Sequence, residues 1–147
     1  MKWKVYLSGE IHTDWRKDLR LLAEKASLNI EFLEPETEHS LSDDMGVMIL
    51  GKEEDQFWHD QKGAKLNSIR IRKNIKDADI VVVKFGEKYK QWNAAFDAGY
   101  AAAYGKSLII MHEKENQHAL KEIDSASTAV VQTTSQLIQI LKYATKS

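Results

Sequence analysis

The sequence predicts an α/β protein in which a five-stranded parallel sheet lies between two layers of helices. Short apolar runs alternate with stretches of helical periodicity along the whole chain. Most connections between these runs are short, and strands that alternate with helices favour a parallel sheet. With 147 residues the chain is long enough for one domain, residues 1–147, with a substantial apolar core.

Five runs rich in β-branched and apolar residues predict the strands. They cover residues 4–7, 29–33, 79–84, 107–111 and 129–132. Pro35, the single proline, ends the second run because it has no backbone N–H to donate. For five strands joined through helices we expect the flavodoxin-like strand order 2-1-3-4-5, a three-layer sandwich.

Helical spacing of apolar residues predicts the helices. They cover residues 14–26, 64–77, 93–104, 117–123 and 135–143. Thr13 and Asn93 are the expected N-caps of the first and third helices, because both side chains can accept a backbone N–H. Gly105 is expected at the C′ position of the third helix, where positive φ favours glycine.

Residues 36–65 are polar and contain three glycines, so they are expected to form a long irregular loop. Such a long loop is uncommon in a compact domain unless it is functional, which predicts a wall of the binding site or a subunit contact. Phe57 and Trp58 lie in this polar stretch, and aromatic residues in such a context often mark interfaces. A homo-oligomer, a dimer or larger, is therefore expected.

Composition excludes several classes of function. A net charge of −1 provides no field that would hold a nucleic-acid polymer or an anionic membrane. The absence of cysteine excludes thiol catalysis, disulfides and cysteine-ligated zinc. No signal peptide or membrane-spanning run is recognisable, so a soluble, cytoplasmic protein is expected.

The segment 91–101 is the most informative of the chain, because Trp92, Asn93 and Asp97 open a helix directly after a buried strand. In the expected topology, residues 8–10 and 85–97 face one crevice at the carboxyl edge of the sheet. Asp97 is expected in the first turn, where the helix dipole would keep the carboxylate ionised for attack on a sugar carbon. The alternative is a surface aspartate that only complements the dipole.

Other charged residues are weaker candidates. Glu10 follows the first strand and is expected to act as a general acid, with Arg16 as an anion contact; alternatively, Arg16 pairs with Asp14 at the surface. The basic residues 70, 72 and 73 could hold a phosphate, although cations near a helix end also offset the dipole. Neither metal-ligand spacing nor a dinucleotide, P-loop or serine-esterase motif is present, so no metal or cofactor is expected.

Residues 5–12, 85–100 and 105–106 together resemble the YtoQ family, which is similar to the nucleoside 2-deoxyribosyltransferases. The resemblance implies a flavodoxin-like fold, an oligomer and a carboxylate nucleophile. Tyr6, Ser8 and Gly9 match the segment that follows the first strand in the transferases, and Asp97 matches their nucleophilic glutamate, with Gly99 and Ala101 after it.

The chain departs from the transferase pattern at several positions. Glu10 stands where the transferases have proline, and Asp97 is one methylene shorter than their glutamate. Trp92 and Asn93 replace small residues and would narrow the pocket. An acid expected about eight residues before Asp79 is absent.

These observations predict an N-glycosyl transferase or hydrolase that acts on a nucleoside- or nucleotide-like small molecule. Asp97 would attack the anomeric carbon, and Glu10 would serve as acid or base. The expected substrate-binding residues are Tyr6, Ser8, Gly9, Phe85, Gly86, Trp92 and Asn93. The alternatives are a non-catalytic pocket for a nucleotide or related metabolite, favoured by the missing acid, and a purely structural subunit, which leaves the clustering around Asp97 unexplained.

Overall fold

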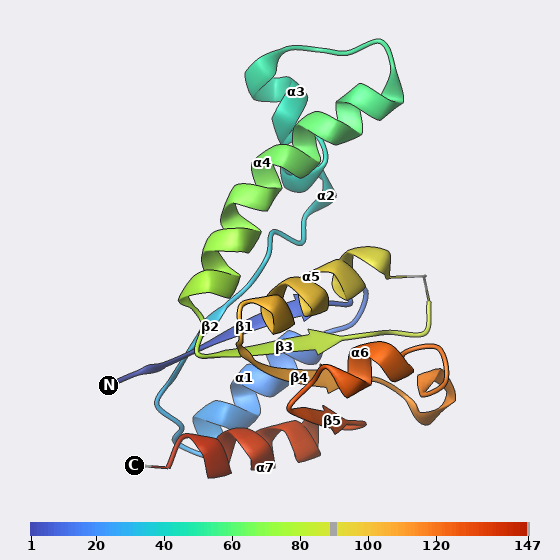
Figure 1. Cartoon of the computed structure of the whole chain (residues 1–147). Helices are drawn as coiled ribbons and strands as arrows, with labels where there is room; N and C mark the ends of the chain where they lie inside the picture. Colours follow the sequence, from blue (N-terminus) through green and yellow to red (C-terminus); the bar gives the residue numbers. More distant parts are fainter. Residues whose placement is uncertain (89–90, 147) are drawn as a thin grey trace. The chain divides into compact units, whose positions relative to one another are not determined.

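The computed structural model describes residues 1–88 and 91–146, with the side chain of His39 excepted. Its centre is a five-stranded, all-parallel sheet of order β2-β1-β3-β4-β5, so the predicted flavodoxin-like fold class is confirmed (Figure 1). The strands are β1 (Trp3–Gly9), β2 (Ile30–Leu33), β3 (Ile80–Lys84), β4 (Ser107–Met111) and β5 (Ala129–Val131). Tyr89, the last residue of the loop expected after β3, and Lys90 lie outside the described residues.

The helices of the sheet unit are close to the predicted ones. They are α1 (Trp15–Lys25), α5 (Trp92–Ala103), the short η1 (Lys114–Asn116), α6 (Lys121–Ser125) and α7 (Thr134–Ala144). The two predicted N-caps are wrong: Asp14 and Gln91 occupy those positions, and Thr13 instead donates its hydroxyl to Glu10. Gly105 has a φ of +68°, as expected for the C′ residue, which follows the C-cap of α5.

Alternate strand residues point to opposite faces of the sheet, which separates two apolar layers. On one face, Val5, Leu7 and Val82 pack in a core with α1 and α7, including Leu19 and Leu137. The other strand positions, such as Tyr6, Ser8, Val81 and Val83, are also buried, and α5 contacts β1, β3 and β4. The buried side of α5 carries small residues, so the helix backbone can approach the sheet closely.

Residues 34–74 form a second compact unit, and the prediction of a long loop at 36–65 is wrong. This stretch contains α2 (His39–Ser42), α3 (Met45–Leu50) and most of α4 (Gln56–Asp77), which begins before the predicted residue 64. Two of its glycines serve close packing rather than a loop: a Cβ on Gly46 would lie 2.4 Å from the backbone nitrogen of Gly63. Since α4 is only weakly amphipathic, its apolar periodicity could not reveal its first half.

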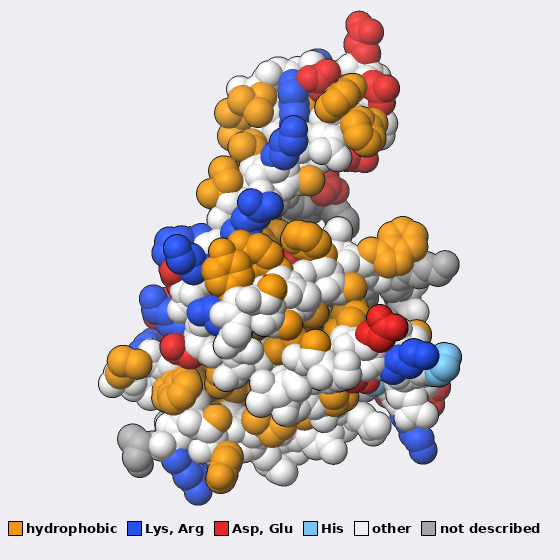
Figure 2. Space-filling view, viewed as in Figure 1, with side chains coloured by type: hydrophobic (Ala, Val, Ile, Leu, Met, Phe, Trp, Pro, Cys, Tyr) orange, Lys and Arg blue, Asp and Glu red, His pale blue; other side chains and the backbone are white. Residues whose placement is uncertain are grey.

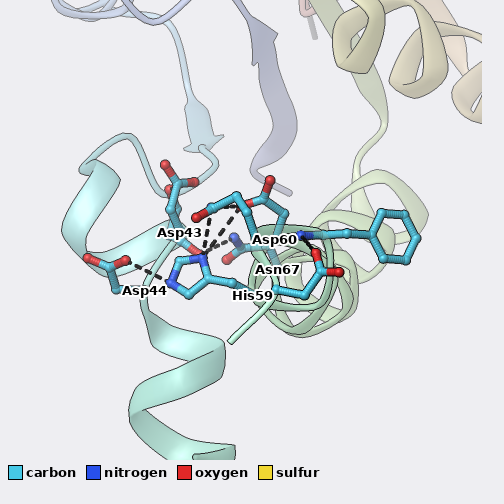
Figure 3. A network of polar contacts seen from close by, with 9 residues as sticks. Asp43, Asp44, His59, Asp60 and Asn67 are labelled. Atoms are coloured by element: carbon cyan, nitrogen blue, oxygen red, sulfur yellow. Dashed lines mark hydrogen bonds and ion pairs between the residues drawn. The ribbon is translucent and has the colours of Figure 1, made fainter. Parts of the chain in front are cut away.

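A polar network fixes the start of α3 to α4 within this unit (Figure 3). The His59 ring on α4 lies 3.2 Å from Asp44 through Nε2 and 3.4 Å from Asp60 through Nδ1. Asn67 donates to the carbonyl oxygen of Ser42 at 2.8 Å. Phe57 and Trp58 contact each other edge to face, and both are more than half exposed.

Within residues 1–88 and 91–146, no helix has the length and apolar character needed to cross a lipid bilayer.

Candidate active site

The chain makes a tight turn where β1 ends beside β3. Ser8 is in register with Val83, and the backbone N–H of Glu10 donates to the carbonyl oxygen of Lys84 at 2.9 Å. Gly9 has a φ of +99°, and a Cβ there would lie 2.0 Å from that same oxygen. Only glycine therefore lets β1 pass so close to β3, and the turn holds Ser8 and Glu10 at the carboxyl edge of the sheet.

Asp97 projects from the buried side of α5 toward this edge. Its side chain is 8% exposed, and Ser8 Oγ donates to its Oδ2 at 2.5 Å. Among the described residues, this is the side-chain hydrogen bond through which the protein holds the Asp97 carboxylate.

Burial raises the pKa of the Asp97 carboxyl, and the Ser8 hydrogen bond only partly offsets this, so the pKa lies above its ordinary value. The expectation of a dipole-stabilised acid in the first helical turn is wrong. Because α5 begins at Trp92, its first turn has no acid, and Asp97 faces inward from the second turn. Its protonation therefore depends mainly on desolvation.

Glu10 is also buried, at 3% exposed, but its carboxylate accepts several hydrogen bonds. The backbone N–H of His12 donates to Oε1, and the hydroxyl and the backbone N–H of Thr13, the latter at 3.2 Å, donate to Oε2. Burial alone would raise the pKa of Glu10, but these donors and the charge of Lys84 bring it below its ordinary value. At neutral pH Glu10 has no proton to donate, which favours a base or an electrostatic role over the expected acid role.

Arg16 is not the surface residue or substrate contact that the sequence suggested. It is 6% exposed, and its guanidinium donates to the carbonyl oxygens of Leu7, Gly9 and Glu10 at 3.2, 3.2 and 2.7 Å. Its Cζ lies 4.7 Å from the centroid of the Trp15 ring, and Trp15 Nε1 also donates to the Glu10 carbonyl at 2.8 Å. Arg16 and Trp15 therefore hold the end of β1 in place.

The loop after β3 reaches the same turn. Phe85 is 6% exposed and donates its backbone N–H to Met111 at 2.8 Å. The Gly86 N–H donates to Gln91 Oε1 at 3.0 Å, and a Cβ on Gly86 would lie 2.3 Å from Cγ of Glu10. The stem of Glu10 therefore packs directly on the Gly86 backbone.

The remaining predicted substrate-binding residues are placed differently from one another. Trp92, 75% exposed, and Asn93 lie exposed at the start of α5. Tyr6 is completely buried within β1. Direct contacts thus join Ser8 with Asp97 and Gly86 with Glu10, whereas the fully buried Tyr6 offers no surface to a ligand. The basic residues 70, 72 and 73 belong to the other unit, where Arg70 lies 3.6 Å from Glu36.

His112 is a buried polar residue for which the sequence predicted no role. It directly follows β4 and is 4% exposed, with Nδ1 2.7 Å from the Glu113 carbonyl oxygen and Nε2 3.0 Å from Asp124 on α6. Because both ring nitrogens face oxygen acceptors, the ring anchors α6 to the carboxyl end of β4. In the sequence, the signal for this buried histidine is its position immediately after the apolar run 107–111.

Two solved structures have the same fold. A conserved protein from Enterococcus faecalis V583 aligns with a TM-score of 0.65 at 15% identity, over 98% of this chain and 99% of that protein. The Clostridium botulinum CMP N-glycosidase BcmB aligns with a TM-score of 0.53 at 15% identity, over 96% and 98% of the two chains. At this identity the similarity concerns the fold alone.

Sequence comparison is more specific. The uncharacterised protein YtoQ of Bacillus subtilis (strain 168) is 40% identical over 143 residues, which cover 97% of each chain. The family model described as nucleoside 2-deoxyribosyltransferase YtoQ matches residues 6–145. The chain therefore belongs to the YtoQ family of nucleoside 2-deoxyribosyltransferase-like proteins.

Proposed function

We propose that this protein cleaves or transfers the N-glycosidic bond of a nucleoside- or nucleotide-like small molecule in the cytoplasm. The observation that carries the proposal is the state of Asp97, a buried carboxylate whose Oδ2 accepts a hydrogen bond from Ser8. It lies at the carboxyl edge of a parallel sheet, where such folds bind ligands. Membership of the YtoQ family and the fold shared with a CMP N-glycosidase support the same class of chemistry.

In this mechanism Oδ1 of Asp97 attacks the anomeric carbon while the bond to the base breaks. The bonding electron pair stays on the base nitrogen, which takes up a proton from solvent. Water or an acceptor hydroxyl then displaces the Asp97 carboxylate from the sugar, so two inversions give net retention. The Ser8 hydroxyl stabilises the carboxylate as it is released, and ionised Glu10 accepts the proton of the incoming nucleophile.

Other residues would bind the substrate. Asn93, exposed one residue into α5, orients the sugar, and the exposed Trp92 indole is better placed than buried Phe85 to stack on the base. Gly9 and Gly86 keep the loop backbone close to the site. Tyr6 could contribute only after it moves, because its side chain has no exposed surface.

The second candidate is a non-catalytic pocket for a nucleotide or related metabolite. Burial shifts Asp97 towards its protonated form, and a protonated carboxyl is a hydrogen-bond donor and a poorer nucleophile than a carboxylate. The two candidates differ in whether a covalent bond to Asp97 ever forms.

Mass spectrometry of the protein incubated with a series of 2-deoxy-2-fluoro nucleosides tests this difference. Fluorine slows the breakdown of a glycosyl ester, so catalysis predicts a sugar adduct on the peptide that contains Asp97. The Asp97→Asn variant is the matched control and should remain unmodified. No adduct and no turnover across the series would overturn catalysis in favour of the binding pocket.

We further propose that the protein forms a homo-oligomer. Along α5 and its C-cap the aromatic residues Trp92, Phe96, Tyr100 and Tyr104 are spaced four apart, and hydrophobic side chains gather on the surface over this helix (Figure 2). The Phe96 and Tyr100 rings stack at 6.2 Å, and Phe96 is 62% exposed. Light scattering at micromolar concentration should give a dimer or larger species that Phe96→Glu weakens, and a wild-type monomer would contradict the proposal.

A further inference from the structure

The turn after β1 contains a set of hydrogen-bond donors that an internal carboxylate occupies. The backbone N–H groups of His12 and Thr13 and the Thr13 hydroxyl all point at the Glu10 carboxylate. These donors directly precede the eleven-residue helix α1. Backbone N–H groups in this position, between a strand and a helix, are suited to an anion such as a phosphate. In this protein the anion that fills the position is covalently part of the chain.

The charges around this turn are also matched internally. Lys84, the last residue of β3, attracts the Glu10 carboxylate, and its Nζ lies 5.7 Å from the centroid of the Trp15 ring. Arg16, the other cation against the turn, is buried and donates to three backbone carbonyl oxygens. Neither cation is therefore presented to a ligand without a competing protein group. An ionised Asp97 would add a second negative charge to the same edge.

We infer that Glu10 is a specificity-determining residue, a built-in anion that admits uncharged nucleoside-like molecules and rejects their phosphate esters. The inference rests on the proposed function and names its substrate class. A nucleoside phosphate would have to displace Glu10 from its donors, or place its own negative charges beside an ionised carboxylate. Juxtaposed like charges act against the wrong ligand, and a preference of about 10²-fold for the nucleoside is expected.

Equilibrium binding tests this inference without any need for turnover. Titration calorimetry would compare a nucleoside with its 5′-monophosphate, on the wild type and on Glu10→Gln. Glutamine keeps the length of the side chain and one acceptor oxygen but removes the charge. We expect the wild type to prefer the nucleoside by about 10²-fold, and Glu10→Gln to reduce this preference at least tenfold by improving affinity for the monophosphate.

Glu87→Gln is the matched control, because it removes the same charge from an exposed residue of the next loop. It should leave the preference unchanged. Lys84→Gln is a second variant that keeps Glu10 and removes its counter-charge, so it should widen the preference for the nucleoside. These variants keep the inference testable if Glu10→Gln folds poorly.

Equal wild-type affinity for the two ligands, or the same preference in the Glu10→Gln and Glu87→Gln variants, would overturn the inference. Absence of binding of both ligands to every variant would overturn it as well. Selective nucleoside binding that depends on Glu10, without any turnover or adduct, would instead refute only the catalytic proposal.

Discussion

Asp97 and Glu10 are two carboxylates near the same end of β1, and their pKa values are shifted in opposite directions. Their exposed fractions are 8% and 3%. Asp97 accepts one hydrogen bond, from Ser8, and its pKa is raised, whereas Glu10 accepts three and is attracted by Lys84, and its pKa is lowered. For Glu10 the hydrogen bonds and the charge of Lys84 outweigh desolvation, whereas for Asp97 the single hydrogen bond from Ser8 does not.

The difference separates the chemical roles of the two groups. Titratable pairs whose environments push their pKa values apart are typical of acid–base sites. Here the carboxyl with the raised pKa accepts one hydrogen bond, from Ser8, and the carboxylate with the lowered pKa accepts three from its own loop. We therefore assign the nucleophile to Asp97, and Glu10 is the carboxylate that is ionised before the reaction begins.

The largest effect should come from Asp97→Asn, which removes the proposed nucleophile. Turnover of a responsive nucleoside should fall by about 10³-fold or more, measured by chromatography of the released base.

The same variant should also change the stability of the fold. The native pKa of Asp97 is raised above its ordinary value of 3.8, so the native state loses stability as pH rises from that value through the raised pKa. The melting temperature of Asp97→Asn at pH 7 should therefore exceed that of the wild type; a lower one would indicate that Asp97 is stabilising when ionised.

Ser8→Ala should enlarge the difference between the pKa values of Asp97 and Glu10. It removes the hydrogen bond that lowers the Asp97 pKa, so the acid limb of the rate–pH profile should move to higher pH. The rate near neutral pH should fall about 10- to 10²-fold and partly recover in alkaline buffer. An unmoved acid limb would show that Asp97 is not the group that titrates.

Gly86→Ala should disturb Glu10 while leaving Asp97 in place. The new methyl group would lie 2.3 Å from Cγ of Glu10, so the variant should lose about 1–3 kcal/mol of unfolding free energy in a urea titration. Gly99→Ala on α5 is the control, because no atom lies within 4 Å of its added Cβ. It should be stabilising by about 0.5–1 kcal/mol, since alanine is the better helix former.

Glu10→Gln should lower the stability of the fold less than Gly86→Ala does, and by an amount that depends on pH. Because the native pKa of Glu10 lies below its ordinary value of 4.5, the carboxylate stabilises the fold above that value. This stabilisation is lost as pH falls through the lowered native pKa. The difference between wild type and variant should be about 1–2 kcal/mol at pH 7 and should shrink in more acidic buffer. A difference that does not vary with pH would mean that the Glu10 charge contributes nothing.

The sequence by itself determined the sheet. Strand runs such as 79–84 and 107–111 are continuous apolar segments bounded by polar residues, and this local pattern is sufficient to place buried parallel strands. The order 2-1-3-4-5 then followed from the alternation of strands and helices. The placement of Ser8 and Asp97 at one edge follows from that topology, because parallel strands present their carboxyl ends together.

Only the tertiary structure decided the states of the charged residues and the fold of residues 34–74. Glu10 is ionised because backbone N–H groups and Lys84, seventy-four residues away, converge on it, and Arg16 is buried because the end of β1 presents three carbonyl oxygens. In the second unit, Gly46 and Gly63 are contact points between helices, which composition alone could not distinguish from loop glycines. The local pattern of apolar and polar residues indicates which side of a segment is buried. The hydrogen bonds of a side chain and the close packing of two backbones depend instead on residues that are distant in the chain.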